Sequence, residues 1–314
     1  MKILVTGGTG LIGSHLIPSL VTRGHEVSVL TRNENKAQKK FAEKINFILG
    51  NPTKQGSWVN ELASMDVIIN LVGANILKKR WSKKRKIELY DSRILSKNNI
   101  LDALKNHISN DSSKKYLLIS PSGVDYYPQS EIKEFVENDP VADNFIGKLC
   151  KDWEPNNGDL SNSNIRIVVF RLGVVFTSSG KGAEMMFLPH KFFIGSWLGN
   201  GKQHFSFIHI DDLVGAIIWA LDNKEIHGTF NLVSPETLSL KETTKIGGKI
   251  MKRWTWLFLP GFILRIILGK RADLLLKGRK VSGKKIQDAG YTFLYPTIES
   301  ALTDILGKKN NDVE

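Results

Sequence analysis

Cysteine is nearly absent from this chain: Cys150 is the only one among 314 residues. A single cysteine excludes an internal disulfide framework and a cysteine-rich metal site, and it is typical of a reducing compartment. His209 has acidic neighbours, but no second histidine or other ligand stands at metal-binding spacing. The sequence therefore predicts a cytoplasmic protein without a bound metal.

Long hydrophobic runs are also lacking. The longest apolar stretch, residues 256–268, is too short to span a bilayer and contains Pro260 and Arg265. Its composition predicts a buried or partly buried helix. The N-terminus enters an apolar strand and a glycine turn at once, which is not the pattern of a signal peptide. We expect no membrane span.

Acidic residues are scarce relative to basic ones, and the formal net charge is +13. Residues 245–285 hold twelve Lys or Arg but a single acid, Asp273, and a second basic run covers residues 78–86. Such charge can attract nucleic acid, anionic lipid or an anionic substrate. No nucleic-acid motif accompanies it, so we favour solvated helix faces and expect no nucleic-acid partner. A peripheral membrane or nucleic-acid binder is an alternative that rests on charge alone.

Glycine is concentrated at the start of the chain. An apolar strand at residues 3–5 precedes Gly7, Gly10 and Gly13, and a helical pattern follows directly. Glycine there lets the backbone approach a diphosphate, while the helix N-terminus offers free N–H groups and partial positive charge. This order predicts a dinucleotide-binding turn, whose cofactor-binding residues are Gly7, Thr9, Gly10, Leu11, Ile12 and Gly13.

Strand-like and helical patterns alternate along most of the chain, which predicts a doubly wound parallel α/β sheet of the Rossmann type. We expect a nucleotide-binding domain over residues 1–233 and a small, mostly helical, substrate-side domain over 234–314. Residues 173–207 are expected to contribute to the substrate lobe. The strands after the first are predicted at 26–31, 46–49, 66–71, 116–120, 165–171 and 228–233.

The second predicted strand ends in Thr31 and Arg32, followed by Asn33. Arg32 stands 19 residues beyond Gly13 (32 − 13), where an NAD-binding unit would carry an acid for the ribose hydroxyls. An arginine there suits the 2′-phosphate of NADP(H) instead. The alternative is an ordinary exposed arginine.

Several segments carry a family resemblance. The segments are TGGTGLIG, residues 70–74, residues 120–127, Trp153-Glu154, and residues 171–175, 207–212, 278–281 and 290–293. Their types and their order resemble those of the extended and atypical short-chain dehydrogenases/reductases. More narrowly, they resemble an epimerase-like group with its own small C-terminal domain, some members of which are labelled cell-division inhibitors. The resemblance implies a Rossmann fold and NADP(H). Further cofactor-site residues implied by it are Asn51, Leu71, Val72, Gly73, Ser92, Ser120, Leu172 and Gly173.

The resemblance fails at the catalytic pair. The related enzymes use Tyr-x-x-x-Lys, whereas this chain has Asn144 four residues before Lys148. Asparagine cannot transfer the proton that the phenol transfers. Lys148 is then expected mainly to hold the cofactor, Ser122 matches a serine that holds the substrate oxygen, and Tyr126 or Tyr127 is left to supply the acid.

Two functions remain open from the sequence. The first is an NADP(H)-dependent reductase or epimerase-like enzyme with an unidentified small-molecule substrate. The second is a weakly catalytic or non-catalytic nucleotide-dependent regulator that acts through a protein partner, with cell division as the process suggested by the label.

Overall fold

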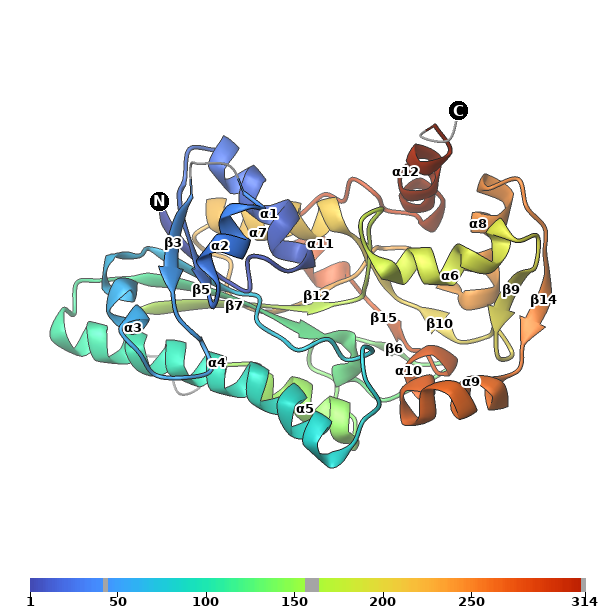
Figure 1. Cartoon of the computed structure of the whole chain (residues 1–314), viewed down its shortest axis with the longest axis horizontal. Coiled ribbons are helices and arrows are strands. Elements are labelled where there is room, and N and C mark those ends of the chain that lie inside the picture. The colour runs from blue at the N-terminus through green and yellow to red at the C-terminus, as the bar shows by residue number, and fades with distance from the viewer. Residues whose placement is uncertain (42–44, 156–163, 312–314) are drawn as a thin grey trace.

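The computed structural model describes residues 1–41, 45–155 and 164–311. Seven strands form its central sheet in the order β12-β7-β5-β4-β1-β2-β3, and every neighbouring pair is parallel (Figure 1). The predicted doubly wound α/β fold is therefore confirmed. The strand bounds are β1 Lys2–Thr6, β2 Glu26–Thr31, β3 Asn46–Leu49, β4 Val67–Asn70, β5 Tyr116–Gly123, β7 Ile165–Leu172 and β12 Gly228–Leu232.

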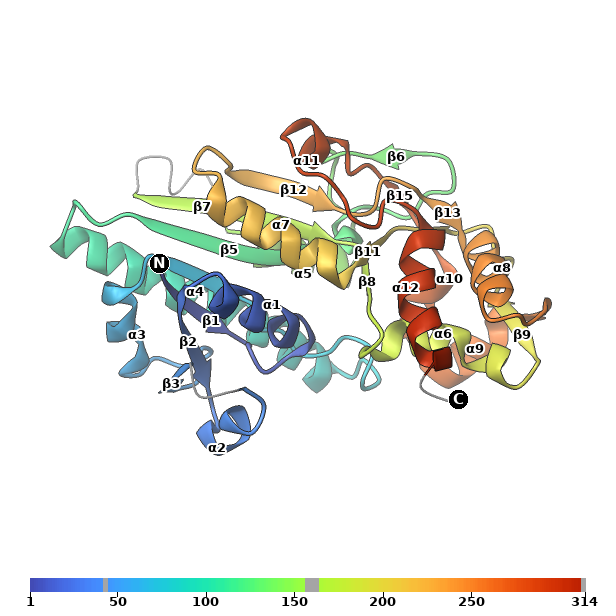
Figure 2. The ribbon, with the colours of Figure 1, turned by 90° about the horizontal axis from the view of Figure 1, so that it is seen from above.

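Helices cover both faces of the sheet (Figures 1 and 2). Parallel strands require this cover because both of their faces must be buried. One face carries α1 Leu11–Thr22, α7 Ile210–Asp222 and α11 Lys284–Asp288, and the other carries α3 Trp58–Glu61, α4 Lys83–Asn110 and α5 Phe145–Trp153. A short helix, α2 Glu34–Gln38, follows β2.

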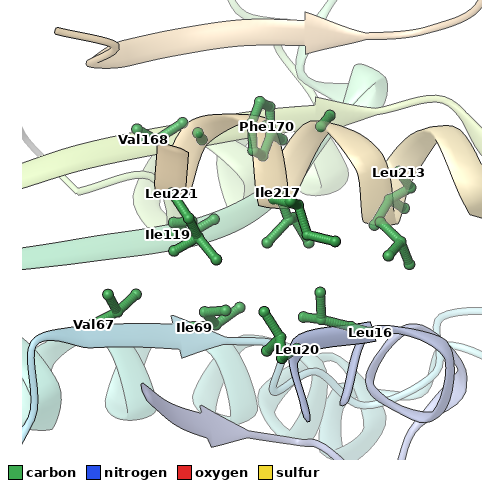
Figure 3. Close-up of a cluster of buried hydrophobic side chains, with 14 of the residues drawn as sticks. Leu16, Leu20, Val67, Ile69, Ile119, Val168, Phe170, Leu213, Ile217 and Leu221 are labelled. Carbon is green, nitrogen blue, oxygen red and sulfur yellow. The ribbon is translucent and has the colours of Figure 1, made fainter. Parts of the chain in front are cut away.

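The successive side chains of β1 belong to two different cores. Ile3 and Val5 pack in the core under α1 and α7, while Leu4 packs in the core under α3 and α4. Figure 3 shows Leu16 and Leu20 of α1 in the first core, with Ile217 and Leu221 of α7 facing the sheet. The apolar run without alternation at the N-terminus thus reflects burial from both sides.

The remaining elements gather at the opposite end of the molecule from the N-terminal strands, as Figures 1 and 2 show, and we call them the lobe. The segment 173–207 pairs twice with the chain beyond residue 234: β9 with β14 in parallel and β10 with β13 antiparallel. The elements are α6 Lys181–Lys191, β9 Gly195–Leu198, β10 His204–Phe205, β13 Leu238–Ser239, α8 Leu240–Ile250, β14 Thr255–Leu259, α9 Gly261–Leu268, α10 Asp273–Leu276 and α12 Ile298–Asn311.

Two further parallel pairs connect the lobe to the sheet. β8 Val174–Phe176 continues from β7 and pairs with β11 Phe207–His209, and β6 Glu134–Phe135 pairs with β15 Lys280–Val281. The lobe has its own core, in which Phe176, Phe187 and Phe207 pack against α12.

The expectation of one buried or partly buried helix over residues 256–268 is wrong. The segment is strand β14, then Pro260, then helix α9, and much of its apolar surface is exposed. The local composition could not reveal that β14 pairs with β9, because that pairing joins residues 60 positions apart (255 and 195). Among the described residues, no helix combines the length and apolar composition needed to cross a bilayer.

Candidate functional site

The turn between β1 and α1 has no room for a side chain at Gly7 or Gly13. Gly7 has φ +69°, and a Cβ there would lie 2.7 Å from the carbonyl oxygen of Leu71. A Cβ on Gly13 would lie 2.2 Å from the carbonyl oxygen of Gly8, so Gly13 lets helix and turn pack closely. Gly10 caps α1, its N–H donates to the Gly7 carbonyl at 2.9 Å, and a Cβ on it would meet that carbonyl at 3.0 Å.

The N-terminus of α1 is left available to an anion. No side chain caps it, and its first turn contains no acid. Free N–H groups and the helix dipole therefore face the edge of the sheet where β1 ends. Lys40, which the sequence did not single out, reaches this turn and donates from Nζ to the Thr9 carbonyl at 2.8 Å.

The end of β2 lies beside this turn because β1 and β2 are neighbours in register. Arg32 is exposed there. Thr31 and Asn33 shape the connection: Thr31 Oγ1 donates to the Asn33 carbonyl at 3.1 Å, and the Asn33 side chain caps α2 by accepting from the Lys36 N–H. At the end of β3, Asn51 Oδ1 accepts from the N–H and hydroxyl of Thr53.

The segment after β4 is held from behind by α4. Arg93 is buried and donates from Nη1 to the carbonyls of Ala74 and Leu89, both at 3.1 Å, and burial lowers its pKa to about 10. The Ser92 hydroxyl accepts from the Ala74 N–H at 3.0 Å and donates to Leu89. Ser92 thus positions the segment that follows Gly73, and its contact with a cofactor stays a prediction.

Residues from five segments that are distant in the sequence meet at the carboxyl ends of the strands. They line a small, wholly apolar cavity. Three predicted cofactor-site residues contribute to it, namely Ile12 from the start of α1, Leu71 after β4 and Leu172 at the end of β7. Gly173 follows, and a Cβ on it would lie 2.9 Å from the Ser206 carbonyl. The remaining lining residues are Ile119, Pro121, Phe170, Leu213 and Ile217.

β5 brings two buried serines to the same edge. Ser120 and Ser122 are almost fully buried, and neither hydroxyl oxygen has a hydrogen-bond partner within the described residues. A buried hydroxyl without a partner is costly, so each is a candidate for a ligand contact. Helix α5 packs beside this strand end, since a Cβ on Gly123 would lie 3.7 Å from Cys150 Sγ.

Asn144 has a structural role at the start of α5. Its Oδ1 accepts from the N–H groups of Ile146 and Gly147, both at 2.9 Å, which is an N-cap. Lys148 follows one turn later and is exposed. The position where the related enzymes carry their acid is therefore occupied by an amide that is engaged with the helix backbone.

The expectation that Tyr127 acts as an acid is not supported by its surroundings. Tyr127 is fully buried, donates to Asn231 Oδ1 at 2.7 Å and accepts from Arg171 Nη1 at 2.7 Å. Burial raises the pKa of its phenol to about 12. The side chain is a structural member of the core. Tyr126 is less buried, and its ring lies under the Arg171 guanidinium, 3.5 Å from the ring centre.

The acids near His209 hold the C-terminal segment in place. Asp212 is buried and accepts from the N–H groups of Leu294 and Tyr295, at 2.7 and 2.9 Å. His209 caps α7, and Asp304 of α12 lies 3.4 Å from its Nε2. The sequence offered this histidine no second ligand, whereas the fold places Asp211 and Asp304 beside it. Only the tertiary structure could bring Asp304 here, 95 residues away (304 − 209).

Comparisons with known proteins fit this arrangement. The model of the NAD dependent epimerase/dehydratase family matches residues 3–232, and a domain of unknown function, DUF1731, matches residues 259–305. The chain belongs to the NAD-dependent epimerase/dehydratase family.

Relatives of this family member match over nearly its whole length. An epimerase family protein SDR39U1 homolog, chloroplastic, from Arabidopsis thaliana is 34% identical over 98% of this chain and 87% of its own. Epimerase family protein YfhF from Bacillus subtilis is 32% identical over 98% of this chain and 99% of its own. The crystal structure of human SDR39U1 (isoform 2) with NADPH superposes with a TM-score of 0.82 at 30% identity, covering 98% of this chain and 99% of the human one.

The family assignment confirms the resemblance seen in the sequence. The glycine turn, the segment after β4 and the end of β7 converge as expected for such an epimerase-family protein. The descriptions of the relatives named above concern epimerase-family proteins and do not mention cell division, so that alternative has no support from them.

Proposed function

We propose that this epimerase-family protein binds NADP(H) along the carboxyl edge of β1, β2, β4, β5 and β7. The observation that carries the proposal is the glycine turn, which excludes any Cβ at Gly7 and Gly13 and presents an uncapped helix start. Arg32 adds positive charge at the end of β2, and Lys40 adds it at Thr9 of the glycine turn. The human relative whose structure was determined with NADPH supports the choice of cofactor.

A dinucleotide in this position would extend from Arg32 towards Leu172 and Gly173. Thr9, Leu11 and the remaining turn residues would contact the diphosphate, while Val72 and Gly73 would line the adenosine half. The lobe, built from residues 173–207 and the chain after 234, would cover the substrate side, with the nucleotide-binding domain over 1–233. The compartment stays a prediction: the single cysteine, which the fold buries, suits the reducing cytoplasm.

The chemistry we infer is reduction or epimerisation of a small molecule. The bound nicotinamide would supply or accept a hydride. Ser122 has the free hydroxyl needed to hold a substrate oxygen, and Lys148 would hold the cofactor from α5. With Asn144 engaged as a cap, Tyr126 is the remaining candidate for proton transfer among the predicted residues.

A nucleotide-dependent regulator is the second candidate function. It is favoured by one observation, the capping role of Asn144, because the site then lacks the phenol at the position that the related enzymes use. In that case the protein would bind the cofactor firmly but turn substrates over very slowly, and it would act through a protein partner.

Cofactor titration tests the proposal. NADPH should bind more tightly than NADH, and Arg32→Asp should weaken NADPH binding by about 10- to 150-fold, the equivalent of the roughly 1.5–3 kcal/mol of a hydrogen bond to a charged group. Lys224→Asp, an exposed charge change elsewhere, is the matched control. Equal affinities of the wild type for the two cofactors would contradict the assignment of Arg32.

A second variant tests the glycine turn itself. Gly10→Val should abolish NADPH binding, because a branched side chain fills the space that the diphosphate needs, while the circular dichroism spectrum stays close to that of the wild type. Gly307→Val on α12, where a Cβ meets nothing within 4 Å, controls for the substitution. Normal binding by Gly10→Val would show that the turn holds no phosphate.

A further inference from the structure

The lobe exposes an unusual concentration of aromatic side chains. Within the described residues, every exposed Phe or Trp lies on it, and Trp254 is 86% exposed. Aliphatic side chains of α9 and the end of α6 extend the same surface. We call this set the aromatic face: Leu188, Phe192, Phe193, Ile194, Trp254, Trp256, Phe258, Phe262, Ile266 and Ile267.

Contacts within the aromatic face connect β14 with the residues that follow α6. Trp256 and Phe258 point outward from β14, while Thr255, Leu257 and Leu259, which alternate with them, are partly buried. Trp256 Nε1 donates to the Phe193 carbonyl at 3.3 Å, and the Arg253 guanidinium lies over the Phe193 ring, 4.2 Å from its centre. Figures 1 and 2 show β9, β14 and α9 together at the end of the molecule far from the N-terminus.

Two residues on or beside the aromatic face have a strained backbone. Phe193 and Lys252 have φ values of +61° and +55°, and they are the two non-glycine residues with positive φ in the described parts of the chain. The left-handed region is unfavourable for side chains of this kind, and such strain gathers at functional sites. Both residues flank the paired strands β9 and β14 and display their side chains to solvent.

The border of the aromatic face is basic. An open depression beside β14 is lined by Lys245, Lys249, Lys252, Arg253, Trp254 and Trp256. Arg265 lies among the exposed apolar residues of α9, where Asp273 pairs with it at 3.5 Å. An apolar surface of this extent with a positive border is complementary to a partner that has an apolar interior and an anionic surface.

We propose that the aromatic face docks this protein on an anionic lipid bilayer. Trp and Phe would insert at the headgroup level, and the lysines and arginines would attract the anionic headgroups. The charge disfavours contact with a second copy of the chain, since a two-fold contact would oppose like charges. Ile266 and Ile267 distinguish a bilayer from a single-stranded nucleic acid, because aliphatic side chains insert among acyl chains but do not stack on bases.

Vesicle sedimentation tests the proposal with the full chain. The protein should bind vesicles of phosphatidylcholine and phosphatidylglycerol, bind those of phosphatidylcholine alone weakly, and release at high salt. Trp254→Ser with Trp256→Ser, and separately Lys249→Glu with Arg253→Glu, should each weaken binding by about tenfold or more. Tryptophan fluorescence should shift to shorter wavelength on the anionic vesicles.

Matched variants away from the aromatic face provide the controls. Ile132→Ser with Leu294→Ser changes exposed apolar residues, and Lys115→Glu with Lys224→Glu changes exposed charges, so both should bind vesicles like the wild type. The proposal is overturned by absence of binding to anionic vesicles, or by binding that the aromatic-face variants leave unchanged. It is equally overturned if the protein binds a single-stranded oligonucleotide in preference to vesicles. It is also overturned if the protein does not bind vesicles and instead forms a dimer that the aromatic-face variants dissociate.

Discussion

At the scale of single residues, two neighbouring tyrosines have different roles. Tyr127 is locked between Arg171 and Asn231 inside the core, whereas Tyr126 is partly exposed at the turn after β5. The sequence could nominate both but could not separate them, because the partners of Tyr127 come from positions 44 and 104 residues away. Burial and hydrogen bonding decide which phenol is free to move a proton.

Phenylalanine substitutions separate these roles. In single-turnover oxidation of NADPH with aldehydes, ketones and nucleotide sugars, Tyr126→Phe should lower the rate by at least about 100-fold, the contribution of a general acid. Tyr127→Phe should leave the rate unchanged but lower the free energy of unfolding by about 1–3 kcal/mol, because Asn231 Oδ1 loses its buried donor. Fast turnover that neither change affects would place the acid elsewhere, and no turnover in any form would favour the regulator.

At the scale of elements, the sequence predicted the seven strands of the sheet well and the lobe poorly. β2 and β3 have the predicted bounds: β2 is a buried run rich in branched apolar residues, and β3 is a short edge strand that ends before Gly50. The segment 256–268 was mistaken for a helix because, over so short a length, its apolar residues fit both the helical period of 3.6 residues and the strand period of 2 residues. Lys40 and Asp304 gave no signal, since only the folded chain places them beside Thr9 and His209.

One contact between elements makes the lobe sensitive to pH. His190 of α6 is buried, and its Nε2 lies 2.8 Å from Thr255 Oγ1 of β14. Burial lowers the pKa of this imidazole from its ordinary value of 6.5. The imidazole of His190 therefore takes up a proton more readily in the unfolded chain than in the folded one. The free energy of unfolding consequently falls as the pH drops below about 6.5, and it stops falling below the pKa of His190 in the folded state.

Replacing His190 by a residue that does not titrate should remove this pH dependence of stability. Between pH 7.5 and 5.5, the wild type should lose up to about 1.4 kcal/mol of unfolding free energy relative to His190→Gln, which can keep a hydrogen bond to Thr255. Chemical denaturation at the two values of pH measures it. His227→Gln, at an exposed histidine, should change with pH like the wild type. Identical behaviour of His190→Gln and the wild type would contradict the assignment.

At the scale of the whole molecule, a buried ion pair joins β7 to segments that lie 17 to 44 residues before it. Arg171 of β7 binds Glu154 through two hydrogen bonds, of 2.7 and 2.8 Å, and also donates to Tyr127 and to the Glu137 carbonyl. Both charged side chains are almost excluded from solvent. Losing one partner would leave the other charge buried and unpaired.

Glu154→Gln should therefore lower the free energy of unfolding by about 3–5 kcal/mol, measured by urea denaturation. The exposed pair of Arg23 and Asp222, at 3.1 Å, offers the control: Asp222→Asn should cost less than about 1 kcal/mol. A similar small loss for both variants would show that the buried pair contributes no more than a surface one.

The strand order also determines how the chain can assemble as the ribosome releases it. β1 lies in the middle, β2 and β3 extend the sheet on one side, and β4, β5, β7 and β12 then extend it on the other in the order of synthesis. Each new strand can dock on an existing edge, and none has to insert between two strands already paired. A nascent chain that ends at Leu172 has six of the seven strands but still lacks α7, which covers Leu16 and Leu20. Until α7 is synthesised, these apolar side chains lack their cover, and exposed apolar surface of this kind is prone to aggregation.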